Sequence, residues 1–163
     1  MHVDALPGRL VRFLDQYANL AFAGTRGRDL VPHGHRVSGW RLGTDGRTLT
    51  AFISEGFTSH LVESVQDNGE FAVTVEEFPS HETYQFKGRY LRHRALQPDD
   101  VEAVDRIRER YVRQMAPLYP DADHLFRAFI PRPELAVEFE VSEVFLQTPG
   151  PGAGARLVPP AEA

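Results

Sequence analysis

The spacing of apolar positions changes several times along the chain, and each change marks a new element. After Pro7, which a first helical turn tolerates, apolar residues recur at helical spacing at Leu10, Val11, Leu14, Tyr17 and Ala18. This spacing predicts an amphipathic helix that ends near Asn19. Between residues 20 and 96 the pattern instead predicts five strands, with turn-forming residues between most of them, at 20–25, 30–42, 48–54, 70–78 and 83–96.

A short helix interrupts these strands. At residues 58–68, Leu61, Val62 and Val65 share one helical face, and Gly69 follows as a natural C-terminal stop. We expect this helix to cross the barrel that the strands form.

The last third of the chain predicts two more helices and one more strand. An acidic first turn after Pro98 begins a surface helix of about 18 residues, and a second helical piece follows at 121–129. Residues 135–141 alternate strictly and predict a strand, and the slip at Ser142 predicts a bulge. We expect residues 1–147 to form one domain, an antiparallel barrel of the α+β class, and the Pro- and Gly-rich residues 148–163 to form an irregular tail.

Composition narrows the class of protein. The 163 residues are 42% hydrophobic and 25% charged, which fits one globular domain. A net charge of -5 without a long basic run argues against nucleic acid as a partner. The apolar stretches fall far short of the roughly 20 residues that cross a bilayer, and no signal-peptide segment is visible, so we expect a soluble cytoplasmic protein with no membrane partner. The absence of cysteine excludes thiolate chemistry and leaves only His or carboxylates for a metal.

The segment from Ile53 to His60 is the first candidate site, because a strand end, a glycine turn and a hydroxyl-rich helix start follow one another. If Thr58 caps the helix, the free N–H groups of Ser59 and His60 face outward with the positive end of the helix dipole. Such an end suits a phosphate dianion. The alternative is a capped helix without a ligand.

The strand at 30–42 carries the second candidate cluster. With a period of two, His33 and His35 project from one face, and Arg36 and Ser38 from the other. Arg36 offers a planar donor fork to a phosphate or to the carbonyl edge of a heterocycle, or else it is an exposed strand arginine. The two histidines alone are too few for a zinc site, so we expect no metal.

The strand at 83–96 gives the third candidate. Thr83, Gln85 and Lys87 share one face, and Gly88 marks a close approach by another backbone or by a ligand. The Gln85 amide can hydrogen-bond the pyrimidine edge of a flavin, although a solvated strand face explains the same pattern. No hydrolase, Walker or dinucleotide motif is visible.

In their order and spacing, these segments resemble the pyridoxamine 5'-phosphate oxidase-like split-barrel family. The resemblance spans roughly residues 10–146 and implies a six-stranded antiparallel split β-barrel with flanking helices. It also implies a homodimer that binds FMN in two equivalent clefts between the subunits. By this resemblance the cofactor-binding residues would be Arg36, Val37, Ser38, Ile53, Ser54, Thr58, Ser59, His60 and Gln85.

The chain departs from the family at two places. Family members more often have Lys or Arg where this chain has Ser59 and His60, which lowers the charge available to the phosphate. The family's oxidases proper end in a basic Arg-x-His stretch, whereas this chain ends in Pro- and Gly-rich sequence, so we do not expect pyridoxamine phosphate oxidase activity.

The leading hypothesis is an FMN-dependent oxidoreductase that acts on a small organic substrate at a homodimer interface, with no catalytic acid or base assigned. One alternative is a binding protein of the same fold that holds a flavin, a deazaflavin or haem without turnover. Another is a metal enzyme that uses His33 and His35.

Overall fold

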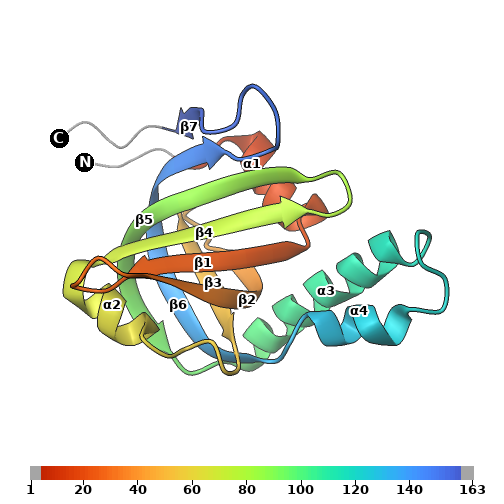
Figure 1. The fold of residues 1–163 in the computed structure, drawn as a ribbon, viewed down its shortest axis with the longest axis horizontal. Helices are drawn as coiled ribbons and strands as arrows, with labels where there is room; N and C mark the ends of the chain where they lie inside the picture. The colour runs from red at the N-terminus through yellow and green to blue at the C-terminus, as the bar shows by residue number, and fades with distance from the viewer. Residues whose placement is uncertain (1–4, 159–163) are drawn as a thin grey trace.

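Six strands close into an antiparallel barrel in the computed structural model, which describes residues 5–158 (Figure 1). The strands run in the hydrogen-bonded order β3-β2-β1-β4-β5-β6, and β3 pairs with β6 to close the barrel. Their bounds are β1 (Leu20–Arg26), β2 (Pro32–Leu42), β3 (Thr48–Ser54), β4 (Glu70–Glu77), β5 (Glu82–Arg94) and β6 (Pro133–Leu146). This is the six-stranded α+β barrel that the sequence predicts.

The barrel interior is filled by the inward side chains of the strands. On β1 the alternation is strict, with Ala21, Ala23 and Thr25 buried and the residues between them facing outward. Phe71 of β4 meets Phe139 of β6 edge to face, with ring centroids 5.0 Å apart. The barrel therefore encloses a packed core and not an open channel.

Gly88 and the bulge at Ser142 fix the contact between β5 and β6. A Cβ atom on Gly88 would overlap the backbone carbonyl of Glu140, so only glycine fits at this position. Beside it the register moves from Gly88 opposite Val141 to Lys87 opposite Glu143, which leaves Ser142 as the extra residue. The predicted bulge and the predicted close approach at Gly88 are both confirmed.

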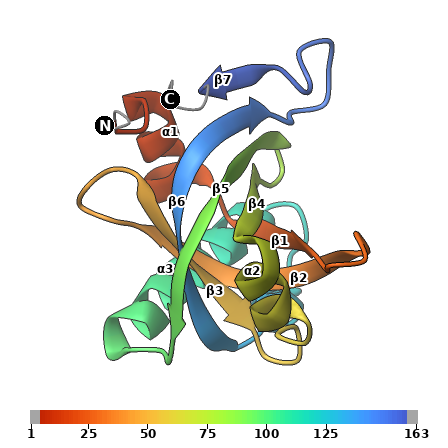
Figure 2. The same cartoon turned by 90° about the vertical axis from the view of Figure 1, so that its left-hand side faces the viewer.

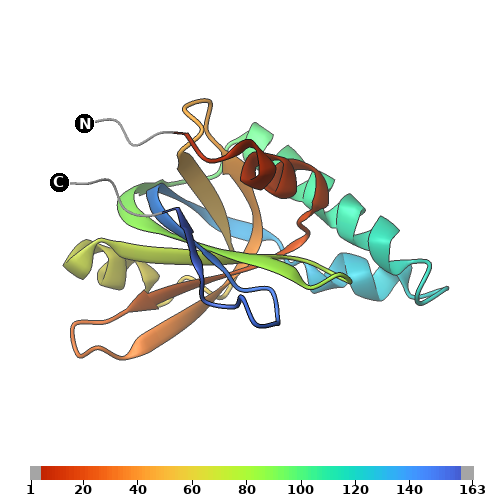
Figure 3. The same ribbon diagram turned by 90° about the horizontal axis from the view of Figure 1, so that it is seen from above.

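Within residues 5–158, four α-helices and one π-helical turn pack on one side and at one end of the barrel. α1 (Gly8–Arg12) continues directly as the π-helix η1 (Phe13–Tyr17), and this segment lies on the same side of the barrel as α3 (Pro98–Met115) (Figure 3). α3 packs on β2 at Gly39, where an added Cβ would lie 3.1 Å from atoms of both Val104 and Ile107. α3 and α4 (Asp123–Phe129) together project beyond the barrel (Figure 1). α2 (Leu61–Asn68) covers one end of it (Figure 2).

The structure differs from the sequence prediction at several ends of elements. The first helix changes to π-helical spacing at Phe13, and β2 begins at Pro32 because Leu30 has a positive φ of 65°. The helix expected from Thr58 begins only at Leu61, and it covers a barrel end where the sequence suggested a helix that crosses the barrel. The tail is not irregular throughout, because β7 (Arg156–Val158) pairs with the end of β6.

Within residues 5–158, none of the helices combines the length and the apolar character that a membrane crossing requires.

Candidate functional site

The loop between β3 and α2, residues 55–60, holds the first group of candidate residues. It ends at His60, which has a left-handed φ of 60° and stands immediately before the first residue of α2. Thr58 is therefore not the helix cap, contrary to the sequence prediction. Its hydroxyl donates instead to Oε2 of Glu134 on β6 at 3.2 Å, and the Gly56 N–H donates to the same oxygen at 3.2 Å.

His35 anchors this loop from inside the barrel. Its Nδ1 donates to the carbonyl oxygen of Phe57 at 2.9 Å, and its Nε2 lies 2.8 Å from the Thr25 hydroxyl. Burial lowers the pKa of His35, and the neighbouring His33 and His60 lower it further, while the bond to Phe57 acts in the opposite direction. His35 is thus neutral at pH 7, with Nε2 accepting from Thr25, and its role is to hold the loop against β2.

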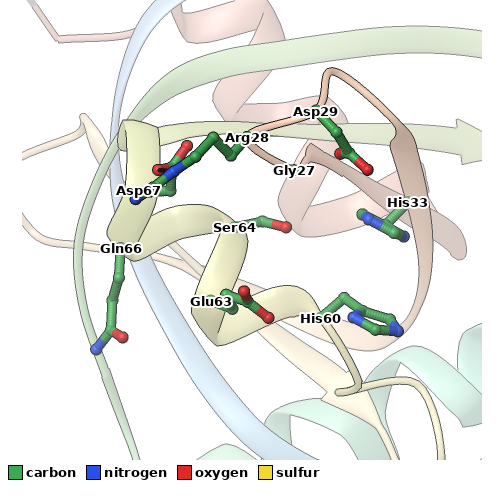
Figure 4. A pocket seen from close by; sticks show the side chains of 9 residues that line it. All are labelled: Gly27, Arg28, Asp29, His33, His60, Glu63, Ser64, Gln66 and Asp67. Carbon is green, nitrogen blue, oxygen red and sulfur yellow. Dashed lines mark hydrogen bonds and ion pairs between the residues drawn. The ribbon is translucent and has the colours of Figure 1, made fainter.

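A cavity of about 810 Å³ lies between α2 and the loop that joins β1 to β2 (Figure 4). The His33 and His60 rings belong to its lining and stack on each other, with centroids 4.9 Å apart and planes 18° from parallel. Arg28 is the one cation that does not depend on pH among the residues that line the cavity, and it pairs with Asp67 at 2.9 Å. The acidic residues in the lining outnumber Arg28, so the carboxylates and the guanidinium together do not favour a dianion in this cavity. The lining consists of Gly27, Arg28, Asp29, His33, His60, Glu63, Ser64, Gln66 and Asp67.

A row of side chains crosses the outer face of the sheet on four adjacent strands. The register places Arg36 of β2 opposite Phe22 of β1, Phe22 opposite Thr74 of β4, and Thr74 opposite Gln85 of β5. Phe22 is 51% exposed, and the Gln85 amide donates to the Thr74 hydroxyl at 3.2 Å. The row therefore gives the outer face an apolar ring on β1 and, two strands away on β5, an amide that is fixed by Thr74.

Next to this row the outer face is hollowed over β1, β4 and β5. We name this depression of about 470 Å³ the sheet hollow; it is lined by Gly24, Thr25, Arg26, Glu70, Phe71, Ala72, Gln85 and Lys87. Gly24 and Ala72 pair across β1 and β4, and a Cβ on Gly24 would meet no atom within 4 Å. Bare backbone therefore forms part of the floor, while Arg26 and Lys87 bring positive charge to the lining.

Four of the predicted cofactor residues are buried and have their contacts within the chain. The Ser38 and Ser54 hydroxyls lie 2.8 Å apart and are almost completely buried. Val37 and Ile53 pair across β2 and β3 and are buried as well. Their contact with a cofactor stays a prediction.

Arg36 also has a partner within the chain. Its guanidinium carbon lies 4.3 Å from the centre of the Phe129 ring, and its Nη2 donates to the Phe129 carbonyl at the end of α4. Arg36 therefore stabilises the docking of α4 on β2, whatever else it binds.

The candidate residues fall into two groups. Thr58, Ser59 and His60 belong to the loop at the barrel end, whereas Arg36 and Gln85 lie on the outer face. Among the cavities found in residues 5–158, His60 and Gln85 line different ones. The sequence analysis missed Glu134, since its contact depends on the pairing of β3 with β6. It also missed Gly24, for which a small residue at an outward position of β1 was the available signal.

Within the part of the chain that the structure describes, no three His, Asp or Glu side chains gather in a way that holds a metal ion. His33 and His35 share a face of β2 as predicted, but the His35 nitrogens are bonded to Thr25 and Phe57 while His33 stacks on His60.

No protein-family model matches the chain, and no curated protein matches it in sequence. Several solved structures do match. HupZ from Group A Streptococcus superposes with a TM-score of 0.53 at 15% identity, over 92% of this chain and 98% of that one. A candidate pyridoxamine 5'-phosphate oxidase from Lactobacillus delbrueckii gives 0.52 at 14% identity, over 89% and 97%. An FMN-binding protein from Syntrophomonas wolfei gives 0.48 at 12% identity, over 82% and 80%.

The chain has the split-barrel fold. HupZ and the Lactobacillus protein, each with a TM-score above 0.5, match it along nearly their whole length, so the entire barrel is shared and not only a hairpin or a sheet. The resemblance drawn from the sequence is confirmed at the level of the fold.

Proposed function

We propose that this protein binds a flavin-type cofactor, with the ring system on the sheet hollow. The observation that carries the proposal is the hollow itself, whose floor of Gly24 and Ala72 leaves the backbone of β1 and β4 bare beside Phe22. A flat three-ring heterocycle needs such a surface, because side chains of ordinary size would hold it away from the sheet. The split-barrel fold, shared with a candidate pyridoxamine 5'-phosphate oxidase, supports the same choice.

The polar residues of the hollow fit the edge of an isoalloxazine. Gln85 offers an amide donor and acceptor, and Arg26 and Lys87 supply positive charge for its carbonyl oxygens and N1. The negative charge of Glu70 is already paired with Arg89 at 2.6 Å. A bound flavin would supply hydride or electron transfer, and in this proposal the chain supplies position and charge without a catalytic acid or base.

FMN is the form of the cofactor that we propose, with its phosphate at the loop of Thr58, Ser59 and His60. His60 of the loop and the residues of the hollow line separate cavities. We infer that a single copy leaves the site incomplete, and that the hollow of one copy and the loop of another hold the two ends of one cofactor. On this ground we propose a homodimer, with exposed Phe22 in the contact.

The visible absorption spectrum of the purified protein tests the proposal directly. We expect flavin bands at about one flavin per chain, or their appearance when FMN is added to colourless protein. Gly24→Val fills the hollow and should abolish ring binding. Gly34→Val is the matched control, because Gly34 is the partner of Gly24 on β2, has the same open surroundings, and does not line the hollow.

Two results would contradict the proposal. The first is protein that binds no flavin at all, and the second is Gly24→Val protein that binds flavin as tightly as Gly34→Val protein. For the homodimer, the mass in solution should be twice the chain mass, and a monomer that retains its flavin would rule the shared site out.

Haem is the second candidate, and the His33–His60 pair at a cavity of about 810 Å³ is the observation that favours it. A neutral imidazole is an ordinary ligand of haem iron. The same spectrum separates the two candidates, because haem gives a Soret band and flavin does not. Loss of that band in His60→Ala protein would then identify the ligand.

A further inference from the structure

The Glu134 carboxylate occupies a place on the β3–α2 loop that an external anion would otherwise use. Its Oε2 accepts both the Gly56 N–H and the Thr58 hydroxyl at 3.2 Å. A backbone N–H and a hydroxyl that converge on one oxygen are the donors with which proteins bind phosphate and carboxylate groups. The loop therefore has a pair of donors suited to an anion, but both already bond to a side chain of the same chain.

The backbone holds Glu134 in this place. Ser54, the last residue of β3, pairs with Pro133, and the Glu55 N–H donates to the Arg132 carbonyl at 2.8 Å. These bonds hold the start of β6 beside the loop, so the carboxylate of Glu134, which follows Pro133, reaches the loop donors. The contact follows from barrel closure and does not depend on a flexible segment.

The charge of Glu134 is not neutralised where it stands. Among the ion pairs of residues 5–158, none includes Glu134, and the neighbouring loop residue Glu55 adds a second negative charge. An incoming dianion would have to displace the carboxylate and approach it closely. In water, a single charge about 5 Å from a dianion weakens binding roughly tenfold.

We propose that Glu134 determines the ligand specificity of this loop, by occupying its donors and repelling a phosphate dianion. The proposal rests on the proposed flavin function for the identity of the natural ligand. It deepens that function, because the FMN phosphate then has to compete with Glu134 for the loop donors, so this carboxylate sets how strongly the loop holds the phosphate. Removal of the carboxylate makes the loop a tighter phosphate site.

Inorganic phosphate is the probe for the first test, since its binding does not depend on a flavin. Isothermal titration would compare the parent protein with Glu134→Gln and Glu134→Ala. We expect phosphate to bind Glu134→Ala protein about ten times more tightly than the parent, because both donors and the charge are released. Glu134→Gln removes the charge and keeps an acceptor, so its gain should be smaller.

Glu102→Gln is the matched control, because it removes one negative charge from an exposed position on α3, outside both the loop and β6. It should leave phosphate binding unchanged. Fluorescence of Trp40, which is buried and bonded to the Leu14 carbonyl, checks that every variant is folded. If neither Glu134 variant binds phosphate more tightly than Glu102→Gln protein, the proposal is wrong.

A second titration, with FMN and with riboflavin, links the loop to the cofactor. The ratio of the two dissociation constants should shift toward FMN about tenfold in Glu134→Ala protein, while riboflavin affinity stays the same. An unchanged ratio would overturn the role of Glu134 in cofactor choice. If no variant binds either flavin, the flavin function fails, and the phosphate titration still decides whether Glu134 blocks the loop.

Discussion

Replacement of Asp100 by Asn should destabilise the fold more than any other single change of charge at the start of α3. Asp100 is completely buried, and its Oδ2 accepts from Arg94 Nη1 at 2.6 Å and from the Gln97 N–H at 2.9 Å. Its Oδ1 accepts from Arg41 at 2.8 Å and from Arg94 Nη2 at 3.2 Å. One carboxylate thus connects β2, β5 and the first turn of α3.

The magnitude follows from these four bonds. An Asn side chain keeps one acceptor oxygen but turns an amide donor toward a guanidinium, so about two charged hydrogen bonds are lost, each of which contributes about 1.5–3 kcal/mol. Breaking a buried ion pair typically costs about 3–5 kcal/mol. Arg94 and Arg41 both reach solvent in part, which lowers the cost. We therefore expect a loss of about 3 kcal/mol.

Urea unfolding followed by Trp40 fluorescence measures this loss. With an m value of about 2 kcal/mol/M, the midpoint should fall by about 1.5 M. The control is Asp99→Asn, which makes the same charge change at an exposed position in the same helical turn. Equal midpoints for the two variants would refute the reasoning, because the loss would then come from the helix dipole and not from the buried pair.

The pH dependence of the stability difference between the parent and Asp100→Asn protein gives an independent check. Burial acts to raise the pKa of Asp100, but the bonds from Arg94 and the Gln97 N–H, together with the charges of Arg94 and Arg41, lower it below its usual value. The ion pair then stabilises the fold fully above the unfolded pKa of about 3.9, and this contribution is lost as the pH falls through the lower folded value. The parent and Asp100→Asn should converge in stability on acidification below about pH 4. A difference that stays constant into this acid range would contradict the assignment.

Three further predictions concern the barrel. Gly88→Ala should cost more than about 4 kcal/mol in urea unfolding, because the methyl group overlaps the backbone of β6; Gly24→Ala, which meets open space, should cost under about 1 kcal/mol. The fold should lose thermal stability as the pH falls below about 6.5, because burial lowers the pKa of His35 and the unfolded chain therefore takes up the proton first. His35→Gln should reduce the change of melting temperature with pH between about pH 7.5 and 5.5, and an unchanged pH dependence would exclude His35 as its source. Arg36→Ala should lower the free energy of unfolding by about 1 kcal/mol through the lost contact with Phe129, and Arg36→Lys should lower it by less. Identical urea midpoints for the parent and both variants would show that this contact contributes nothing.

The fold could be predicted largely from the chain, because its signals are periodic and local. The strand at Thr48–Ser54 and the helix at Pro98–Met115 have the predicted bounds, since alternation and an acidic first turn mark them clearly. The start of α2 could not be predicted, because the left-handed φ of His60 depends on how the loop is tied to β2 and β6. The strand β7 was missed since it forms only by pairing with the end of β6.

The candidate site could be predicted only in part, because its contacts join residues distant in the sequence. Hydroxyls at Thr58 and Ser38 were visible as hydrogen-bonding groups, yet their partners are Glu134 and Ser54, which only the closed barrel brings near. The lesson is specific to barrels: closure pairs β3 with β6, so Gly56 and Thr58 of the loop at that seam meet Glu134, which lies 78 and 76 positions further along the chain.

The alternation of β2 is the step that separates the two candidate surfaces. His35 faces the barrel interior and fixes the loop through Phe57, while the next residue, Arg36, faces outward to Phe129. No rotation of a side chain brings the imidazole and the guanidinium to one face of the same strand. In the homodimer that we propose, a ligand that uses both the loop donors and the outer face would lie between two copies of the chain. If the protein instead proves to be a monomer in solution, the loop and the sheet hollow serve different ligands, and the loop has to be assigned without reference to a flavin.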